Sequence, residues 1–213
     1  MSDGGGDLAG LIRGRRTEKV LGDVDHPAPV SSRLAEERRS QILDAIRTAG
    51  WAPFHYARDV DGIAEPWRVH YLSHELCHRL AVELRDDFKV MSKEPRLLAG
   101  CGAMVLVTWL PEADMDGAAN QAAKARDEEH LAAASAMVQN LLLLLTEMGL
   151  GSYWSSGGIL REPSMFKRLG IPEREKLLAA VFVEFPEARA PGAERKPGGQ
   201  RPRRGEGWLR ELS

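Results

Sequence analysis

Apolar residues recur at every third or fourth position in several stretches of the chain, a spacing that places them on one face of a helix. One stretch covers residues 34–49, where Ser32 can cap the start of a helix and Gly50 ends it. Ser73 can cap a further helix that runs to about residue 90. Two more helices are expected, a short one over residues 7–12 and the longest one over residues 122–148.

Other stretches alternate with period two or are continuously apolar, which is typical of strands. Residues 67–72 alternate, whereas residues 102–110 and 177–185 are rich in apolar and β-branched side chains and predict central strands. The few strands lie between helices, so we expect an α+β fold with a mixed layer of helices and sheet, not a doubly wound nucleotide-binding sheet.

The composition changes along the chain and divides it into three parts. Residues 1–6 are polar and glycine-rich and are expected to form a disordered tail. Residues 7–186 hold the apolar segments and suit one domain. Residues 187–213 are rich in Pro, Gly and Arg and cannot form a core of their own, so this arm either stays solvated or lies across another surface.

The net charge and the cysteines limit the cellular location and the binding partners that we expect for this protein. A net charge of −2 gives no general attraction to nucleic acid or to an anionic membrane. The longest apolar run, residues 141–145, is too short to span a bilayer, and no apolar segment follows Met1. Cys77 and Cys101 are interpreted as small buried side chains in a reducing compartment. We therefore expect a cytoplasmic protein that binds neither nucleic acid nor membrane.

The common catalytic motifs are missing from the sequence. It contains no P-loop, no dinucleotide-binding glycine pattern, no HExxH and no GxSxG, and we expect no metal site. Arg15, Arg16 and Thr17 are well suited to holding a phosphate, although a solvated charge run at a helix end has the same composition. His55 could present a ring nitrogen to a ligand or could bond to backbone in its own loop.

The stretch GLGSYWSSGG, residues 149–158, follows the leucine-rich part of the longest helix. Its glycines, serines and aromatic rings suit a loop on which a flat or anionic ligand rests, because the backbone can approach closely. A helix C-cap followed by a buried strand explains the same residues. From the stretch alone, both interpretations stay open.

Three motifs in order resemble the FMN-dependent nitroreductase family, in particular its short members. Arg15-Arg-Thr-Glu-Lys19 is similar to the RRSxR opening of that family, and the segment APFH…EPW, residues 52–67, is similar to its AP…(N/Q)PW segment. MGLGSYW, residues 148–154, resembles the GLGSxW loop that follows the long central helix. The resemblance covers residues 7–186.

The resemblance implies a nitroreductase-like three-layer fold, with a mixed, mainly antiparallel central sheet flanked by helices, in a homodimer with two FMN molecules at its interface. It further implies roles for individual residues, with His55 acting from the partner's side of the site. Implied cofactor-binding residues are Arg15, Arg16, Thr17, Lys19, His55, Trp154, Ser155, Ser156, Gly157 and Arg203. No catalytic side chain is implied, since the flavin carries the hydride chemistry.

The chain departs from the family pattern at several positions. Thr17 replaces the usual Ser and Lys19 the usual Arg, whereas Glu65 stands where an amide usually precedes Pro-Trp, exchanging a donor for an acceptor. The loop between Pro53 and Pro66 is longer than the family pattern by about six residues. A basic residue of the arm is expected at the phosphate; Arg201, Arg203 and Arg204 all qualify.

The expected function is an NAD(P)H oxidoreductase: NADH or NADPH reduces FMN and leaves, and a planar electron-poor acceptor such as a nitroaromatic or a quinone then takes the hydride. An alternative is a non-enzymatic FMN carrier or sensor, or an interaction protein whose arm docks nucleic acid or an acidic partner. Another alternative keeps the fold but changes the chemistry, to dehalogenation or a flavin-consuming reaction. Within the arm, Trp208 and Leu209 are expected to anchor it on a second subunit.

Overall fold

The structure is a computed structural model and describes residues 7–113, 121–190, 192–199 and 203–212. Two sequence-based expectations fall outside these ranges: the N-terminal tail of residues 1–6 and Arg201.

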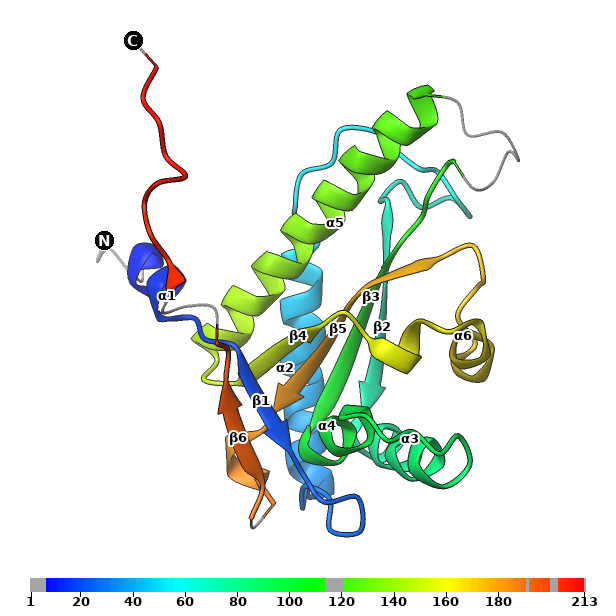
Figure 1. The fold of residues 1–213 in the computed structure, drawn as a ribbon, viewed down its shortest axis with the longest axis vertical. Helices are drawn as coiled ribbons and strands as arrows, with labels where there is room; N and C mark the ends of the chain where they lie inside the picture. Colours follow the sequence, from blue (N-terminus) through cyan, green and yellow to red (C-terminus); the bar gives the residue numbers. More distant parts are fainter. Residues whose placement is uncertain (1–6, 114–120, 191, 200–202, 213) are drawn as a thin grey trace.

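A four-stranded antiparallel sheet forms the middle of the molecule (Figure 1). Its order places the two most apolar strands in the centre, because only central strands are covered on both faces and paired on both sides. The strands are, in order across the sheet, β2 (Trp67–Ser73), β3 (Ala103–Trp109), β5 (Lys176–Glu184) and β4 (Gly151–Ser155). The predicted strands over 67–72, 102–110 and 177–185 are confirmed, the latter two as central strands.

Helices cover both faces of the sheet and give three layers (Figure 1). One face packs on α2 (Ser32–Ala49) and α5 (Gln121–Glu147). The other packs on α3 (His74–Asp86), α4 (Glu94–Gly100) and α6 (Pro163–Leu169). The expected α+β class and the flanking helices are confirmed, and every strand pair within the described residues is antiparallel.

The helix ends follow the predicted caps with two corrections. Ser73 caps α3 as expected, and its Oγ accepts a hydrogen bond from the Leu76 N–H at 3.4 Å. The cap of α2 is Ser31 and not Ser32, because Ser31 has the extended backbone of a cap. α3 ends at Asp86 rather than near residue 90, where Lys89 adopts a φ of +52° that no helix can continue.

The N-terminal and C-terminal segments form a second, smaller sheet that the hydrophobic pattern did not predict. After α1 (Leu8–Gly14), the chain enters β1 (Glu18–Leu21), which pairs antiparallel with β6 (Glu194–Pro197). Part of the predicted arm is therefore hydrogen-bonded to the folded domain. Two short 3₁₀ turns complete the structure, η1 (Gly158–Arg161) and η2 (Pro186–Ala188).

The leucine-rich part of α5 is mostly core. Leu141, Leu142 and Leu145 are buried, whereas Leu143 and Leu144 are only half-buried. No helix in the described ranges has the length and the apolar character to cross a membrane. Those ranges also contain no cluster of three or more His, Cys, Asp or Glu side chains that could hold a metal ion.

Candidate flavin site

The basic N-terminal segment begins where α1 ends, and Arg16 folds back onto that end. Its guanidinium donates hydrogen bonds to the carbonyl oxygens of Arg13 at 2.7 Å and Gly14 at 2.8 Å. The last carbonyls of a helix have no partner within the helix, so a nearby guanidinium satisfies them. Thr17 follows directly and accepts a hydrogen bond from the Gly198 N–H at 2.9 Å, next to the end of β6.

The glycine-rich stretch begins as a helix C-cap, as its first two glycines suggested. Gly149 has a φ of +72°, and its N–H donates to the Thr146 carbonyl at 3.0 Å. The Leu150 N–H donates to the Leu145 carbonyl at 2.9 Å, which closes the end of α5 in a Schellman-type turn. β4 starts immediately afterwards, so the interpretation as a C-cap followed by a strand is confirmed for residues 149–155.

Alternation along β4 sends the predicted contacts to opposite faces of the sheet. Tyr153 packs in the core beneath α3 and α4, whereas Trp154 packs against the core beneath α2 and α5 and points its Nε1 at the Leu178 carbonyl, 3.4 Å away. The side chain of Ser155, on the same face as Tyr153, accepts a hydrogen bond from the Gly157 N–H at 3.2 Å. Ser156 is exposed at the following turn.

The turn after β4 requires glycine. Gly157 and Gly158 have φ values of +105° and +54°, in the left-handed region that side chains disfavour. A Cβ on Gly158 would lie 2.6 Å from the Glu94 Oε1 atom, so the absent side chain also lets α4 approach. Glu94 is buried, and its Oε2 has no hydrogen-bond partner in the structure.

β1 lies beside β4 and brings Lys19 to Tyr153. The Lys19 Nζ lies 5.1 Å from the centre of the Tyr153 ring, and the Lys93 Nζ lies 5.3 Å from the same centre. Lys93, which precedes α4, also donates a hydrogen bond to the Tyr153 hydroxyl at 3.0 Å. Burial raises the pKa of Tyr153, but hydrogen bonds with Lys93 and Ser155 and the two ammonium charges hold the pKa below its ordinary value.

Tyr153 and Lys93 were not among the residues expected from the sequence. Lys93 lies in an unremarkable polar stretch, and nothing in a linear pattern indicates that it faces residue 153. The nearest signal was the position of Tyr153 within GLGSYWSSGG. The structure therefore brings Lys19 together with Tyr153 and Ser155, and adds Lys93 to them.

Within the described residues of one chain, His55 makes no contact with this group. Its ring stacks on Tyr56, with ring centres 4.6 Å apart, in an exposed loop after α2. Figure 1 shows that loop beside the N-terminal half of α5, whereas α1 and β1 lie toward the C-terminal end of α5. Arg58 of the loop reaches Glu112, which contacts Arg126 and His130 on α5. At the other end of α5, Leu143 and Leu144 line a hollow together with α1.

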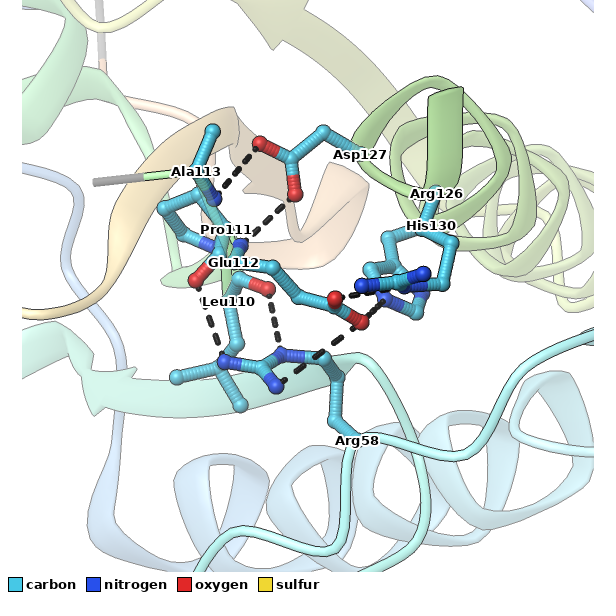
Figure 2. Close-up of polar contacts among 8 residues, drawn as sticks. All are labelled: Arg58, Leu110, Pro111, Glu112, Ala113, Arg126, Asp127 and His130. Atoms are coloured by element: carbon cyan, nitrogen blue, oxygen red, sulfur yellow. Dashed lines mark hydrogen bonds and ion pairs between the residues drawn. The ribbon is translucent and has the colours of Figure 1, made fainter. Parts of the chain in front are cut away.

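A dense polar network holds the long loop around His55 in place (Figure 2). Arg58 donates to the Leu110 carbonyl at 2.9 Å and to the Pro111 carbonyl at 3.1 Å, at the end of β3. Glu112 accepts from Arg126 at 2.6 Å and contacts the Nε2 of the buried His130 at 2.9 Å, both on α5. The extra loop residues are therefore attached to both β3 and α5.

The same network stabilises the ionised form of the Glu112 carboxyl, although the residue is largely buried. Burial raises the pKa of its carboxyl, but hydrogen bonds from His130 and Arg126 outweigh the burial and hold the pKa below the ordinary 4.5. Asp127 accepts hydrogen bonds from the backbone N–H groups of Glu112 and Ala113, at 2.7 and 3.3 Å. Both carboxylates bind the connection between β3 and α5.

Two hollows border these segments. A cavity of about 650 Å³ lies between α1 and the C-terminal end of α5 and is lined by Leu8, Leu11, Leu143, Leu144 and other residues. A second, of about 570 Å³, lies beside the start of the long loop and is lined by Trp51, Phe54, Glu65, Arg68 and others. Neither hollow includes Tyr153 or Lys93 in its lining.

Arg203 is exposed in the C-terminal segment. Residues 203–212 run away from the sheet toward the C terminus (Figure 1). Within this segment Trp208 is 80% exposed and Leu209 is 65% exposed. The described structure therefore shows Arg203 outside the group formed by Lys19, Lys93 and Tyr153.

Comparison with solved structures identifies the fold. A nitroreductase-like family protein from Bacillus cereus is 19% identical with a TM-score of 0.61, and the match covers 96% of this chain and 98% of that one. A nitroreductase with bound FMN from Bacteroides fragilis is 18% identical with a TM-score of 0.55, covering 98% and 100%. A nitroreductase from Desulfovibrio desulfuricans, named as putative and in complex with FMN, is 21% identical with a TM-score of 0.54, covering 84% and 86%. The nitroreductase-like fold is thereby confirmed.

Sequence comparison agrees. The protein named "Putative NAD(P)H nitroreductase YfhC" of Bacillus subtilis (strain 168) is 28% identical over 200 residues, 89% of this chain and 90% of that protein. The pattern that defines the Nitroreductase family matches residues 31–183, which is most of the chain. The chain therefore belongs to the nitroreductase family.

Proposed function

We propose that the protein is an FMN-dependent NAD(P)H oxidoreductase that delivers a hydride to a planar, electron-poor acceptor such as a nitroaromatic or a quinone, in a ping-pong sequence. Membership of the family supports the reaction class. The name of the Bacillus subtilis relative supports NAD(P)H as the donor, and the FMN in two structural neighbours supports the cofactor. When bound, FMN supplies the hydride chemistry.

One observation carries the proposal: two motifs about 130 residues apart in the sequence meet in space. β1 continues the RRTEK segment and lies beside β4, which carries GLGSYWSSGG, and the Lys19 ammonium lies over the Tyr153 ring. A core-packing role for each motif alone does not require a cationic side chain at their junction. Their meeting is expected if both motifs hold one ligand.

The donor chemistry of these residues fits FMN. Arg15, Arg16 and Thr17 supply guanidinium and hydroxyl donors suited to a phosphate, with Arg203 as a further candidate. Lys19, Ser155, Ser156 and Gly157 would contact the rest of the cofactor. Trp154 would contribute backbone groups only, since its side chain points into the opposite core.

The protein's own groups would orient the cofactor and exclude water from part of it. The donors at the end of α1 act on a charge that the cofactor carries in every redox state, so they contribute affinity rather than rate. N–H groups of the turn after β4 would stabilise charge on the ring, a preorganised electrostatic contribution, and the Gly157 N–H would exchange its bond to Ser155 for one to the ring. Arg16 would exchange its bonds to the α1 carbonyls for bonds to the phosphate.

We further propose a homodimer with FMN at the interface. His55 stacks on Tyr56 and makes no contact with Lys19 or Tyr153 within the described residues of one chain, so we assign it to the flavin site of a second copy. The exposed Leu8 and Ile12 of α1, the half-buried Leu143 and Leu144, and the exposed Trp208 support an apolar interface around α1, α5 and the arm. A cytoplasmic location stays a prediction.

A spectrum tests the proposed function. Purified or FMN-reconstituted protein should be yellow, with flavin absorption that bleaches when NADH or NADPH is added without oxygen, and colour should return on adding a quinone. Flavin that binds without bleaching would instead indicate a carrier or sensor. A protein that neither carries nor takes up FMN would overturn the proposal.

A further inference from the structure

A buried carboxyl group touches the turn that follows β4. Glu94, the first residue of α4, is only 5% exposed. A Cβ on Gly158 would lie 2.6 Å from the Oε1 atom of Glu94 and 2.9 Å from its Cδ atom. The carboxyl group therefore lies directly against one of the two glycines that form the turn, Gly157 and Gly158.

Glu94 differs from the other buried acids in the described part of the chain. Glu175 lies 2.8 Å from the His70 Nε2 atom, and Glu184 pairs with Arg189. The Oε2 atom of Glu94 has no hydrogen-bond partner, and within the described residues its carboxylate forms no ion pair. Burial of a carboxylate without a donor or a counter-ion is unfavourable. Packing alone is served better by an apolar side chain, so the carboxylate points to a role in the neighbouring turn.

Backbone contacts fix α4, which carries Glu94, relative to β1. A Cβ on Gly100 would lie 2.6 Å from the Val20 carbonyl oxygen, and one on Gly22 would lie 2.8 Å from the Gly100 backbone nitrogen. The Gly22 N–H also donates to the Arg96 carbonyl at 2.9 Å. β1 and α4 can approach this closely because both crossing points are glycine. The first residue of α4 is thereby held in a fixed place beside the turn.

The turn is also enclosed from a second side. A Cβ on Gly157 would overlap the side chain of Leu177 on β5. The Gly157 N–H donates to the Ser155 Oγ at 3.2 Å. With Leu177 against one glycine and Glu94 against the other, the two residues have little room to change their positive φ values. The direction of the N–H groups in the turn therefore depends on Glu94.

We propose that Glu94 is a positioning residue of the flavin site: its carboxylate holds the Gly157–Gly158 turn in the conformation that presents N–H groups to the ring, and its negative charge disfavours reduction of the ring. This inference rests on the proposed function and adds a buried acid to the site. Glu94 acts through the turn, and no contact with the flavin is assigned to it.

The charge of Glu94 opposes the effect of the N–H groups in the turn. A flavin ring carries more negative charge when it is reduced, so N–H groups favour the reduced ring and a carboxylate behind them disfavours it. Lys93, the neighbour of Glu94, donates its hydrogen bond to Tyr153 and not to the carboxylate. Because no direct counter-ion neutralises Glu94, its charge acts on the ring at short range in a poorly solvated place.

Hydrogen exchange in the flavin-free full chain tests the contact between Glu94 and the turn. Glu94→Ala opens a gap beside Gly158, so the backbone amides of residues 156–162 should exchange severalfold faster. Glu94→Gln keeps the shape of the side chain and should leave their exchange nearly unchanged. Glu129→Gln, which replaces an exposed acid on α5, is the control. Equal exchange in Glu94→Ala and in the unmodified protein would overturn the positioning role.

The midpoint potential of bound FMN tests the role of the charge. Glu94→Gln should strengthen the binding of reduced FMN relative to oxidised FMN by about threefold to tenfold, measured as a higher midpoint potential, because one negative charge near the ring is removed. Glu94→Asp keeps the charge and should return the potential toward that of the unmodified protein. Glu129→Gln should not change it.

Binding of FMN and of riboflavin, which lacks the phosphate, shows which part of the cofactor depends on Glu94. Glu94→Ala should weaken both ligands by the same factor, about tenfold, because the turn is no longer held in its binding conformation and contacts the ring. Weaker binding of FMN with unchanged binding of riboflavin would show that Glu94 acts on the phosphate contacts and would overturn the assignment to the ring.

The outcomes separate this inference from the proposed function. Failure of the unmodified protein to bind FMN would overturn the proposed function, and hydrogen exchange of the flavin-free chain would still decide whether Glu94 holds the turn. An unchanged midpoint potential in Glu94→Gln, in protein that binds FMN normally, would overturn the role of the charge and leave the proposed function standing.

Discussion

Glu112 lies in the polar network beside the long loop, where it contacts Arg58, Arg126 and His130, and its charge is stabilised only in the folded chain. Because its pKa is below the ordinary 4.5, its contribution to stability is present above pH 4.5 and is lost as the pH falls through the lower folded value. We expect the melting temperature to fall on acidification below about pH 4.5. Glu112→Gln should lose about 2 kcal/mol at pH 7 and show a smaller acid-dependent decrease.

Thermal melts of the two proteins from pH 3 to pH 8 provide the measurement. Glu36→Gln is a matched control, since Glu36 is exposed and, among the described residues, forms its ion pair with Arg39 on the same helix. If the melting temperatures of Glu112→Gln and of the unmodified protein fall equally on acidification, the ionisation of Glu112 is not coupled to folding.

Gly149 gives a second prediction at this scale. Nothing lies within 4 Å of a Cβ added there, so Gly149→Ala costs only the left-handed φ of +72°. We expect a loss of about 1 kcal/mol, read from chemical denaturation. Gly205→Ala, which also meets no neighbour and needs no positive φ, should leave stability unchanged. Equal stability of the two variants would mean that the end of α5 does not need its left-handed residue.

At the scale of elements, side-chain contacts attach the long loop after α2, residues 54–65, to the segment after β3 and, through Glu112, to α5. Arg58 attaches the loop to the carbonyls of Leu110 and Pro111, directly after β3, and its own N–H closes the loop on the Ala64 carbonyl at 2.8 Å. Arg58→Ala should therefore speed limited proteolysis within residues 54–65 severalfold while α5 stays protected. Arg47→Ala, on the exposed face of α2, should not change the cleavage rate; equal rates in all three proteins would show that the loop is held by other contacts.

At the scale of the whole molecule, the arm and the domain share a strand, which decides how the arm can be tested. Truncation after Phe185 would remove β6 and expose β1, so loss of the dimer would be ambiguous. A chain that ends at Gly199 keeps β6 and removes the exposed Trp208 and Leu209. We expect it to dimerise more weakly in sedimentation experiments and to retain less FMN; unchanged mass and flavin content would count against an interface role for the arm.

The sequence predicted the elements whose signal is periodic and local. Long apolar runs were enough to predict the core strands at 102–110 and 177–185 and the helix at 122–148. An element that is covered on both sides needs apolar side chains along most of its length, and such a run is visible in the sequence. β1 and β6 were missed, since Glu18–Leu21 and Glu194–Pro197 are too short to show a pattern and become strands only by pairing with each other, as in the pair Leu21 and Glu194. α4 was missed because its seven residues follow α3 too closely to show a period of their own.

The sequence by itself determined the family resemblance, the helices and strands of the core, and the presence of cationic and glycine-rich motifs. Only the tertiary structure decided which side chains meet. Alternation along β4 sends Trp154 and Tyr153 to opposite faces, and the glycine crossing of β1 and α4 brings Lys93 to Tyr153. Composition is local and can be read along the chain, whereas the meeting of Lys19, Lys93 and Tyr153 depends on contacts between segments 60 or more residues apart.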